Sequence, residues 1–188
     1  MKREDPTDQA VVAAVLAGDR DAFGVLVQRH QRRVYHALWR LCGDAEEAEE
    51  MAQGAFVRAY FALDGYKPEY QFSTWLFRIA YHLFLNERRD HRREVAFDVG
   101  DEPDEDPAQR IEDPTGPPHA EVEARELRRS IRRAVTALPE EYRTVIVLRH
   151  MQELSYAEIG EITGLPVGTV KSRLARARHQ LAGLLGSD

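Results

Sequence analysis

Helical periodicity constrains this chain more than any other feature of its sequence. Apolar residues recur at every third or fourth position over most of its 188 residues, and no segment sustains the alternation of apolar and polar residues that a strand would need. The pattern stops over residues 94–120, where acidic residues, prolines and glycines replace most apolar ones. Such a stretch buries too little apolar surface to offset its ordering entropy. We therefore predict an all-α fold in which two small helical domains, residues 1–93 and 121–188, are joined by a flexible acidic linker.

Four helices are expected in the N-terminal domain, because each candidate segment has a local start or stop signal. They cover residues 8–18, 21–41, 45–63 and 72–93. Either Ser73 or Thr74 is expected to cap the fourth helix. The apolar sides of the last three helices predict a core that contains Phe23, Leu26, Val27, Val34, Leu38, Leu41, Met51, Phe56, Tyr60, Leu63, Trp75, Leu76, Ile79, Leu83 and Phe84.

The C-terminal domain is also expected to be helical, over residues 120–138, 139–151 and 156–163, and the stretch 164–181 is expected to start the last helix. Ser155 and Glu158 fit a capping box, and Gly164 fits a C-cap. Pro139 suits the first turn of a helix. The apolar seam of the first of these helices is Val122, Leu127, Ile131 and Val135.

The last helix is basic although the chain as a whole is acidic. Residues 164–181 contain Lys and Arg but no acidic residue, whereas the whole chain has a net charge of -6. A short capped helix, a glycine turn and a basic second helix together describe a helix-turn-helix. The alternative is an ordinary amphipathic helix whose charges are solvated. The capping box, the turn and the absence of acidic residues favour the helix-turn-helix.

The two sides of that helix would have different roles in binding DNA. At about 100° per residue, one side is apolar and anchors the helix, whereas the opposite side is polar and faces the major groove. Arginine can pair there with guanine in bidentate fashion. The anchoring side is Val170, Leu174, Ala177 and Leu181. The reading side is Thr169, Ser172, Arg173 and Arg176, while Lys171 and Arg178 lie on the flank and suit phosphates.

Composition argues against several other kinds of site. Cys42 is the only cysteine, so neither an internal disulfide nor a cysteine-rich zinc site is expected, and the seven histidines show no ligand spacing. Without a glycine-rich phosphate loop, a nucleophile elbow or a metal motif, we expect no enzyme activity and no cofactor. No run of residues has the apolarity of a signal peptide or the length of a membrane-spanning helix. We expect a cytoplasmic protein without membrane insertion.

Long segments of both domains resemble one known family. Residues 137–181, ALPEEYRTVIVLRHMQELSYAEIGEITGLPVGTVKSRLARARHQL, resemble region four of bacterial RNA polymerase sigma factors of the extracytoplasmic-function (ECF) group. In the N-terminal half, AGDRDAFGVLVQRHQRRVY, AEEMAQGAFVRAYFALDGY and FSTWLFRIAYHLFLNERR resemble successive parts of region two, in the right order and spacing. Response regulators carry a related helix-turn-helix, but not this N-terminal half.

The resemblance implies a promoter-specificity subunit without catalytic chemistry of its own, which works bound to core RNA polymerase. In this group, region two binds the coiled coil of the beta-prime subunit, captures the −10 element and helps to melt it. Region four reads the −35 element and contacts the beta flap. An anti-sigma factor is a further partner that the resemblance implies. The alternative is a polymerase-independent transcription factor with the same helix-turn-helix, and the region-two segments argue against it.

Polymerase binding in this group depends on acidic residues followed by Gln-Glu. Glu49, Glu50 and Gln53 match that motif, whereas Gly54 stands where the glutamate is expected. The resemblance therefore implies a polymerase-binding site that is altered at one position.

Recognition of the −10 element is implied for the loop over residues 65–71 and for the exposed side of the helix after it. An extruded base would stack on Tyr66 or Tyr70, although Tyr66 could instead belong to the core, as we expect for Trp75. His82 stands where family members often have asparagine. The implied residues are Tyr66, Lys67, Tyr70, His82, Asn86 and Arg89.

Each of two charged segments can be interpreted in two ways. The basic end of the fourth helix either contacts the DNA backbone or is simply solvated. The acidic residues of the linker either mimic phosphates in a polymerase channel or form a solvated tether. The helix end contains Arg88, Arg89, Arg92 and Arg93, and the linker acids are Asp101, Glu102, Asp104, Glu105 and Asp106.

Overall fold

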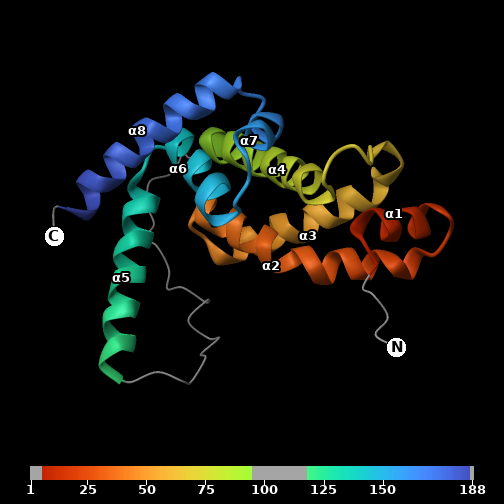
Figure 1. The fold of residues 1–188 in the computed structure, drawn as a ribbon, viewed down its shortest axis with the longest axis horizontal. Helices are drawn as coiled ribbons and strands as arrows, with labels where there is room; N and C mark the ends of the chain where they lie inside the picture. Colours follow the sequence, from red (N-terminus) through yellow and green to blue (C-terminus); the bar gives the residue numbers. More distant parts are fainter. Residues whose placement is uncertain (1–5, 95–117, 187–188) are drawn as a thin grey trace.

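The computed structural model describes residues 6–94 and 118–186, and every regular element in these ranges is helical (Figure 1). The N-terminal domain contains α1 (Asp8–Leu16), α2 (Phe23–Cys42), α3 (Ala45–Phe61) and α4 (Phe72–Glu94). The C-terminal domain contains α5 (Pro118–Ala137), α6 (Glu140–Ile146), a π-helical turn (Val147–Met151), α7 (Tyr156–Thr163) and α8 (Val167–Leu185). The predicted all-α class is confirmed. Most of the predicted linker lies outside the described residues.

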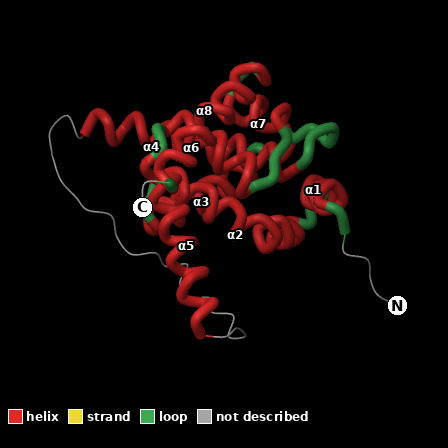
Figure 2. Tube along the Cα trace, turned by 60° about the vertical axis from the view of Figure 1, so that its left-hand side comes forward, coloured by secondary structure: helices red, strands yellow, loops and turns green. Residues whose placement is uncertain are grey.

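The core of the N-terminal domain lies between α2, α3 and α4, which pack side by side (Figures 1 and 2). Asp44 directs the chain from α2 into α3, because its carboxylate accepts the Glu47 N–H at 2.8 Å and caps the new helix. The predicted stripe of α2 is buried, with Val27 only half-buried. The side chains in this core that exclude solvent almost completely include Leu26, Val34, Leu38, Leu76 and Phe84.

Helix α4 begins before its predicted caps. The N–H of Trp75 already donates to the Gln71 carbonyl at 3.2 Å, so Ser73 and Thr74 lie inside the helix. The prediction that one of them caps α4 is wrong. The Thr74 side chain is buried and donates a hydrogen bond to Glu158 of α7 at 2.8 Å instead. A contact over so long a sequence separation leaves no local signal in the sequence.

The helix-turn-helix of α7 and α8 follows the prediction closely. The capping box at Ser155 and Glu158 is present, and Gly164 adopts the left-handed conformation at φ 72° that ends α7. The turn is tight, because a β-carbon on Gly160 would lie 2.9 Å from the Leu165 carbonyl oxygen. Only glycine permits this approach. The predicted anchoring side is buried at Val170, Leu174 and Ala177 and half-buried at Leu181.

The C-terminal half of helix α5 packs against the other helices, and the ribbon of its N-terminal part extends away from them (Figure 1). Val135 is buried and Ile131 half-buried, as predicted. Leu127 is 60% exposed, so its assignment to the seam is wrong. The side chain of Val122 lies outside the described part. Periodicity identifies the apolar face of a helix but not how far neighbouring helices extend along it.

Arg143 of α6 joins the two domains through backbone carbonyls. Its guanidinium donates to the Leu41 carbonyl near the end of α2 at 2.7 Å, and to the carbonyls of Thr136 and Leu138 at the end of α5. Carbonyls at helix C-termini have no partner within their own helix. Burial, and then the nearby charge of Arg88, lower the pKa of Arg143. An arginine nevertheless remains charged at neutral pH, so it can satisfy these acceptors together.

We expect Arg143→Met to lower the free energy of unfolding by about 2–5 kcal/mol, because a hydrogen bond to a charged group contributes roughly 1.5–3 kcal/mol and several carbonyls lose their donor. Urea unfolding followed by circular dichroism measures this change. Arg129→Met, on the exposed face of α5, is the matched control and should change stability by less than about 0.5 kcal/mol. Equal stability of the two variants would contradict the role of Arg143.

Candidate nucleic-acid interface

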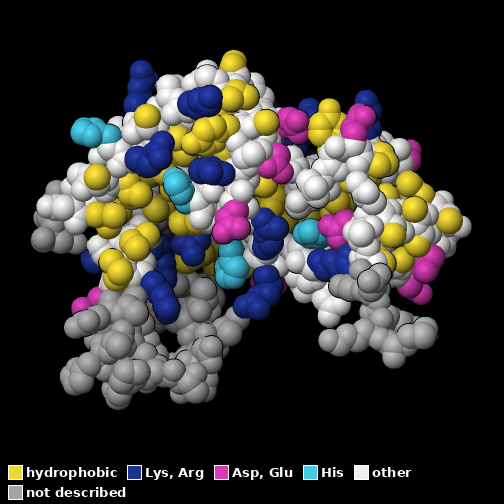
Figure 3. Space-filling view, viewed as in Figure 1, with side chains coloured by type: hydrophobic (Ala, Val, Ile, Leu, Met, Phe, Trp, Pro, Cys, Tyr) yellow, Lys and Arg dark blue, Asp and Glu magenta, His cyan; other side chains and the backbone are white. Residues whose placement is uncertain are grey.

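The α8 residues predicted to bind DNA lie on the side of the helix that the core leaves uncovered. Helices α7 and α8 stand together at the top of the view in Figure 2. Lys and Arg side chains gather over the upper left of Figure 3, where α8 lies. Four of the predicted residues are exposed, namely Lys171, Ser172, Arg176 and Arg178, whereas Thr169 and Arg173 are half-buried. The exposed surface of α8 is therefore available to an anionic ligand.

The basic residues of α8 differ in their contacts within the protein. Arg173 forms an ion pair with Glu141 of α6 at 2.9 Å. The Lys171 ammonium lies 6.0 Å from the centroid of the Tyr156 ring. Arg176 makes no hydrogen bond or ion pair in the part of the chain that the structure describes. Of the two arginines on the reading side, Arg176 can therefore contact a base without first losing a partner.

Positive charge extends from α8 to the π-helical turn beside it. Burial lowers the pKa of His150, and the charges of Arg178 and Arg149 lower it further. The Arg178 Nε donates to the Leu174 carbonyl one turn earlier at 3.3 Å, which holds its side chain along the helix. The role of Arg178 as a phosphate contact stays a prediction.

The loop before α4 differs from the prediction in the role of one tyrosine. Tyr66 is only 6% exposed, and its ring packs against Phe72 and Trp75 at centroid distances of 5.7 and 5.4 Å. Its hydroxyl donates to the Tyr70 carbonyl at 2.6 Å. In this arrangement Tyr66 cannot stack on a base and instead holds the shape of the loop. Tyr70 is 44% exposed and Lys67 is exposed, so the side chains of these two residues are accessible from solvent.

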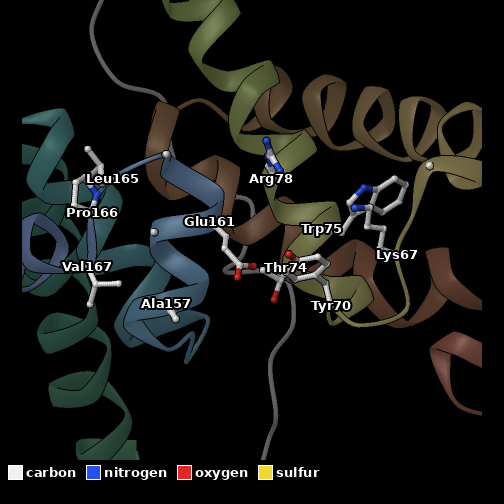
Figure 4. A pocket seen from close by; sticks show the side chains of 13 residues that line it. Lys67, Tyr70, Thr74, Trp75, Arg78, Ala157, Glu161, Leu165, Pro166 and Val167 are labelled. Atoms are coloured by element: carbon white, nitrogen blue, oxygen red, sulfur yellow. The ribbon is translucent and has the colours of Figure 1, made fainter.

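A cleft of about 770 Å³ lies beside this loop, between α4 and the helix-turn-helix (Figure 4). Its wall in the N-terminal domain includes Lys67, Tyr70, Trp75 and Arg78. Trp75, which we expected in the core, is half-buried, and it both packs against the core and lines the cleft. The sequence analysis did not select Arg78. Its spacing from His82, one turn along the same helix, was the available signal.

The remaining predicted residues of α4 extend from the cleft as one row. Arg78, His82, Asn86 and Arg89, which we call the α4 row, are all exposed and follow one another at helical spacing. Arg89 Nη2 donates to Asn86 Oδ1 at 3.2 Å, so these two side chains orient each other. The α4 row and the cleft together form a continuous polar and aromatic surface that suits single-stranded nucleic acid.

The basic end of α4 contains one structural arginine. Arg88 donates to the Cys42 carbonyl at 2.9 Å, and its guanidinium lies 5.5 Å from the Phe84 ring centroid. It is therefore not available for the backbone contact that was one of the two interpretations of this segment. The side chains of Arg92 and Arg93 lie outside the described part of the chain.

A different surface on α3 carries the residues predicted to bind polymerase. Glu49, Glu50 and Gln53, which we call the α3 face, are exposed, and Gln53 Nε2 donates to Glu49 Oε1 at 3.4 Å. A β-carbon on Gly54 would lie 3.7 Å from Leu83, an ordinary van der Waals distance. Packing of α3 on α4 therefore does not require glycine where the family motif has glutamate.

The described residues contain no group of three or more His, Cys, Asp or Glu side chains that could hold a metal ion. Residues 6–94 and 118–186 also include no helix that is long and apolar enough to span a membrane.

Comparison with known proteins gives the same two regions in the same order. The family model for sigma-70 region 2 matches residues 26–94, and the model for sigma-70 region 4 matches residues 128–181. The ECF RNA polymerase sigma factor SigW of Bacillus subtilis is 40% identical over 173 residues, which cover 90% of this chain and 92% of SigW. The ECF RNA polymerase sigma-E factor of Escherichia coli K12 is 36% identical over 184 residues, covering 95% of this chain and 94% of the relative.

A solved structure extends the likeness to three dimensions. The structure of CnrH in complex with the cytosolic domain of CnrY is 29% identical, with a TM-score of 0.68 over 97% of this chain and 99% of that chain. Both regions, their order and the nearly full coverage of several relatives agree with the helices and surfaces described above. The chain therefore belongs to the ECF group of sigma-70-family RNA polymerase sigma factors.

Proposed function

We propose that the protein binds core RNA polymerase through the α3 face, reads the −35 element with α8, and captures the −10 element with the cleft and the α4 row. The observation that carries this proposal is that one chain presents these three separate surfaces within the two family regions. Region two would comprise residues 1–93, the linker 94–120 and region four 121–188. The protein would act in the cytoplasm, where polymerase and chromosomal DNA meet, and would need neither a cofactor nor catalytic chemistry of its own.

The residues of α8 are proposed to have two different roles in binding DNA, which follow from their positions on the helix and their contacts within the protein. Arg176 has no partner among the described residues and projects from the exposed side, so it is proposed to contact a base edge together with Thr169 and Ser172. Arg173 would first have to leave Glu141, which is 2.9 Å away. Lys171 and Arg178, on the flank, would bind phosphates.

Recognition of the −10 element would combine stacking with attraction of the backbone. Tyr70 and Trp75 offer aromatic faces, and Lys67 and Arg78 offer positive charge on the same wall of the cleft. Stacking of a base on an aromatic ring contributes roughly 1–3 kcal/mol in proteins that bind single strands. His82, Asn86 and Arg89 would contact the strand further along α4.

Protein partners are proposed from charge and from the family. The α3 face is acidic and exposed, which suits the beta-prime coiled coil, and region four would contact the beta flap. An anti-sigma factor is a further proposed partner, supported by the likeness to CnrH, whose structure was solved with the cytosolic domain of CnrY.

Run-off transcription tests the proposed function directly. With core polymerase and genomic fragments, the protein should give discrete start sites, each preceded by a shared pair of elements. Alone it should bind duplex DNA weakly, because the net charge is -6 and each reading surface is small. Tight, salt-resistant binding of the protein alone to one duplex, without any stimulation of polymerase, would instead indicate a polymerase-independent transcription factor.

The α3 face is tested by charge reversal. Glu50→Lys should weaken binding to core polymerase roughly tenfold, or about 1.4 kcal/mol, and Gln53→Ala should weaken it less, because both side chains are exposed and neither supports the core. Titration of labelled protein with core enzyme measures the affinity. Glu126→Lys, which makes the same change on α5, is the control. If the two Lys variants bound core polymerase with equal affinity, the polymerase-binding site would not be on the α3 face.

The reading side of α8 is tested with promoters that carry every single substitution in the −35 element. Arg176→Ala should relax preference at one or two positions by roughly 1–3 kcal/mol each. Lys171→Ala should lower transcription from all promoters about equally and reduce its salt dependence. Arg20→Ala, an exposed arginine of the N-terminal domain, is the control. An unchanged preference profile for folded Arg176→Ala would show that the reading side is placed wrongly.

A further inference from the structure

Helix α1 is fastened to α2 by polar contacts at its first residue. Asp8 Oδ1 accepts a hydrogen bond from Arg29 Nη1 at 2.8 Å, and Asp8 Oδ2 lies 2.6 Å from His30 Nε2. Each carboxylate oxygen therefore has its own partner, which fixes the orientation of the side chain. Val11 and Val12 of the same helix are each only 4% exposed. These contacts fix α1 on the N-terminal domain.

The next residue of α1 reaches the loop over residues 65–71. Gln9 Nε2 donates to the Pro68 carbonyl at 2.7 Å. Helix α1 also contacts the short 3-10 turn (Leu63–Gly65) that leads into this loop (Figures 1 and 2). Pro68 stands between Lys67 and Tyr70, which both line the cleft. A hydrogen bond to the backbone at Pro68 therefore restricts the positions of these two side chains.

A second connection runs from α1 to the end of the loop through aromatic rings. The His30 ring lies 5.5 Å from the ring of Phe72, which in turn lies 5.7 Å from the ring of Tyr66. Burial raises the pKa of Tyr66, and the negative charge of Asp8 raises it further. The Tyr66 hydroxyl consequently stays protonated at neutral pH and donates to the Tyr70 carbonyl at 2.6 Å. Asp8 thus supports the hydrogen bond that closes the loop.

The loop needs such support because it has few backbone hydrogen bonds of its own. The N–H of Tyr66 donates to the Leu63 carbonyl and the N–H of Tyr70 to the Lys67 carbonyl, each at 3.1 Å. A loop that becomes ordered only on binding loses conformational entropy at that moment, which weakens binding. A loop that is already held in its binding conformation avoids this loss.

We propose that Asp8 and Gln9 are positioning residues for the −10 strand, which hold the loop over residues 65–71 so that Lys67 and Tyr70 face the cleft before the strand arrives. This inference rests on the function proposed above. Both residues act through the loop rather than on the strand. They precede residues 26–94, which the region 2 model matches, so the proposal gives α1 a role in recognition that this region alone does not include.

The first test removes one hydrogen-bond donor and measures the loop itself. In the full chain, Gln9→Met keeps the length of an exposed side chain but cannot donate to the Pro68 carbonyl. Hydrogen exchange measured by mass spectrometry should show the loop amides exchanging roughly three- to tenfold faster, because loss of the bond favours local opening. Gln9→Lys, which keeps an N–H donor, should restore the slower exchange.

The second test measures strand binding by the same variant in holoenzyme assembled with core polymerase. Gln9→Met should bind a labelled single strand, carrying the −10 sequence of a promoter mapped by run-off, roughly two- to fivefold more weakly than the wild type. Its affinity for core polymerase and its urea unfolding midpoint should not change, since Gln9 is exposed. Asp8→Ala, which removes the anchor of α1, should weaken strand binding at least as much.

A matched variant makes the outcome specific. Gln28→Met, the same change at an exposed position of α2, should alter neither loop exchange nor strand affinity. Loop exchange in Gln9→Met equal to the wild type overturns the proposal, as does faster exchange with unchanged strand affinity, or absence of strand binding by the wild-type holoenzyme. Run-off by the wild-type protein is read separately. Its failure would refute the proposed function, whereas discrete start sites together with any of those results refute only the role of α1.

Discussion

Two arginines hold the C-terminal end of α2, and both domains depend on these contacts. Arg88 of α4 donates to the Cys42 carbonyl at 2.9 Å, and Arg143 of α6 donates to the Leu41 carbonyl at 2.7 Å. The last carbonyls of a helix lack partners and form the negative end of its dipole, so a guanidinium satisfies both needs. Burial, the main influence, raises the pKa of Cys42 to about 11. The thiol consequently stays protonated at neutral pH, which agrees with a structural role.

Basic and acidic side chains of the protein lie on different surfaces. The chain has a net charge of -6, yet α8 contains no acidic residue and the neighbouring π-helical turn adds the positive charge of Arg149. Acidic side chains concentrate elsewhere, for example on the α3 face. Local basic surfaces are sufficient for a subunit that approaches DNA as part of a larger complex, whereas a globally basic protein would bind DNA unspecifically.

Features with a local cause could be predicted from the sequence, and features decided by distant contacts could not. The capping box at Ser155 and the C-cap at Gly164 follow from residues within one turn, so both were predictable. The sequence left Tyr66 open between base stacking and the core, and the structure gives the second role, whereas Trp75, expected in the core, packs against it but also lines the cleft. Tyr66 is buried because its hydroxyl reaches the Tyr70 carbonyl while its ring packs on Phe72, and periodicity contains no information about such contacts.

Glu158 joins the start of α7 to α4 through two different carboxylate oxygens. Its Oε2 accepts the Ser155 N–H at 2.8 Å, and its Oε1 accepts the Thr74 hydroxyl at 2.8 Å. Because the two donors do not compete for one oxygen, the cap of α7 and the contact with α4 are satisfied together. One carboxylate therefore both begins the first helix of the helix-turn-helix and fastens that helix to the N-terminal domain, so the position of α8 depends on it.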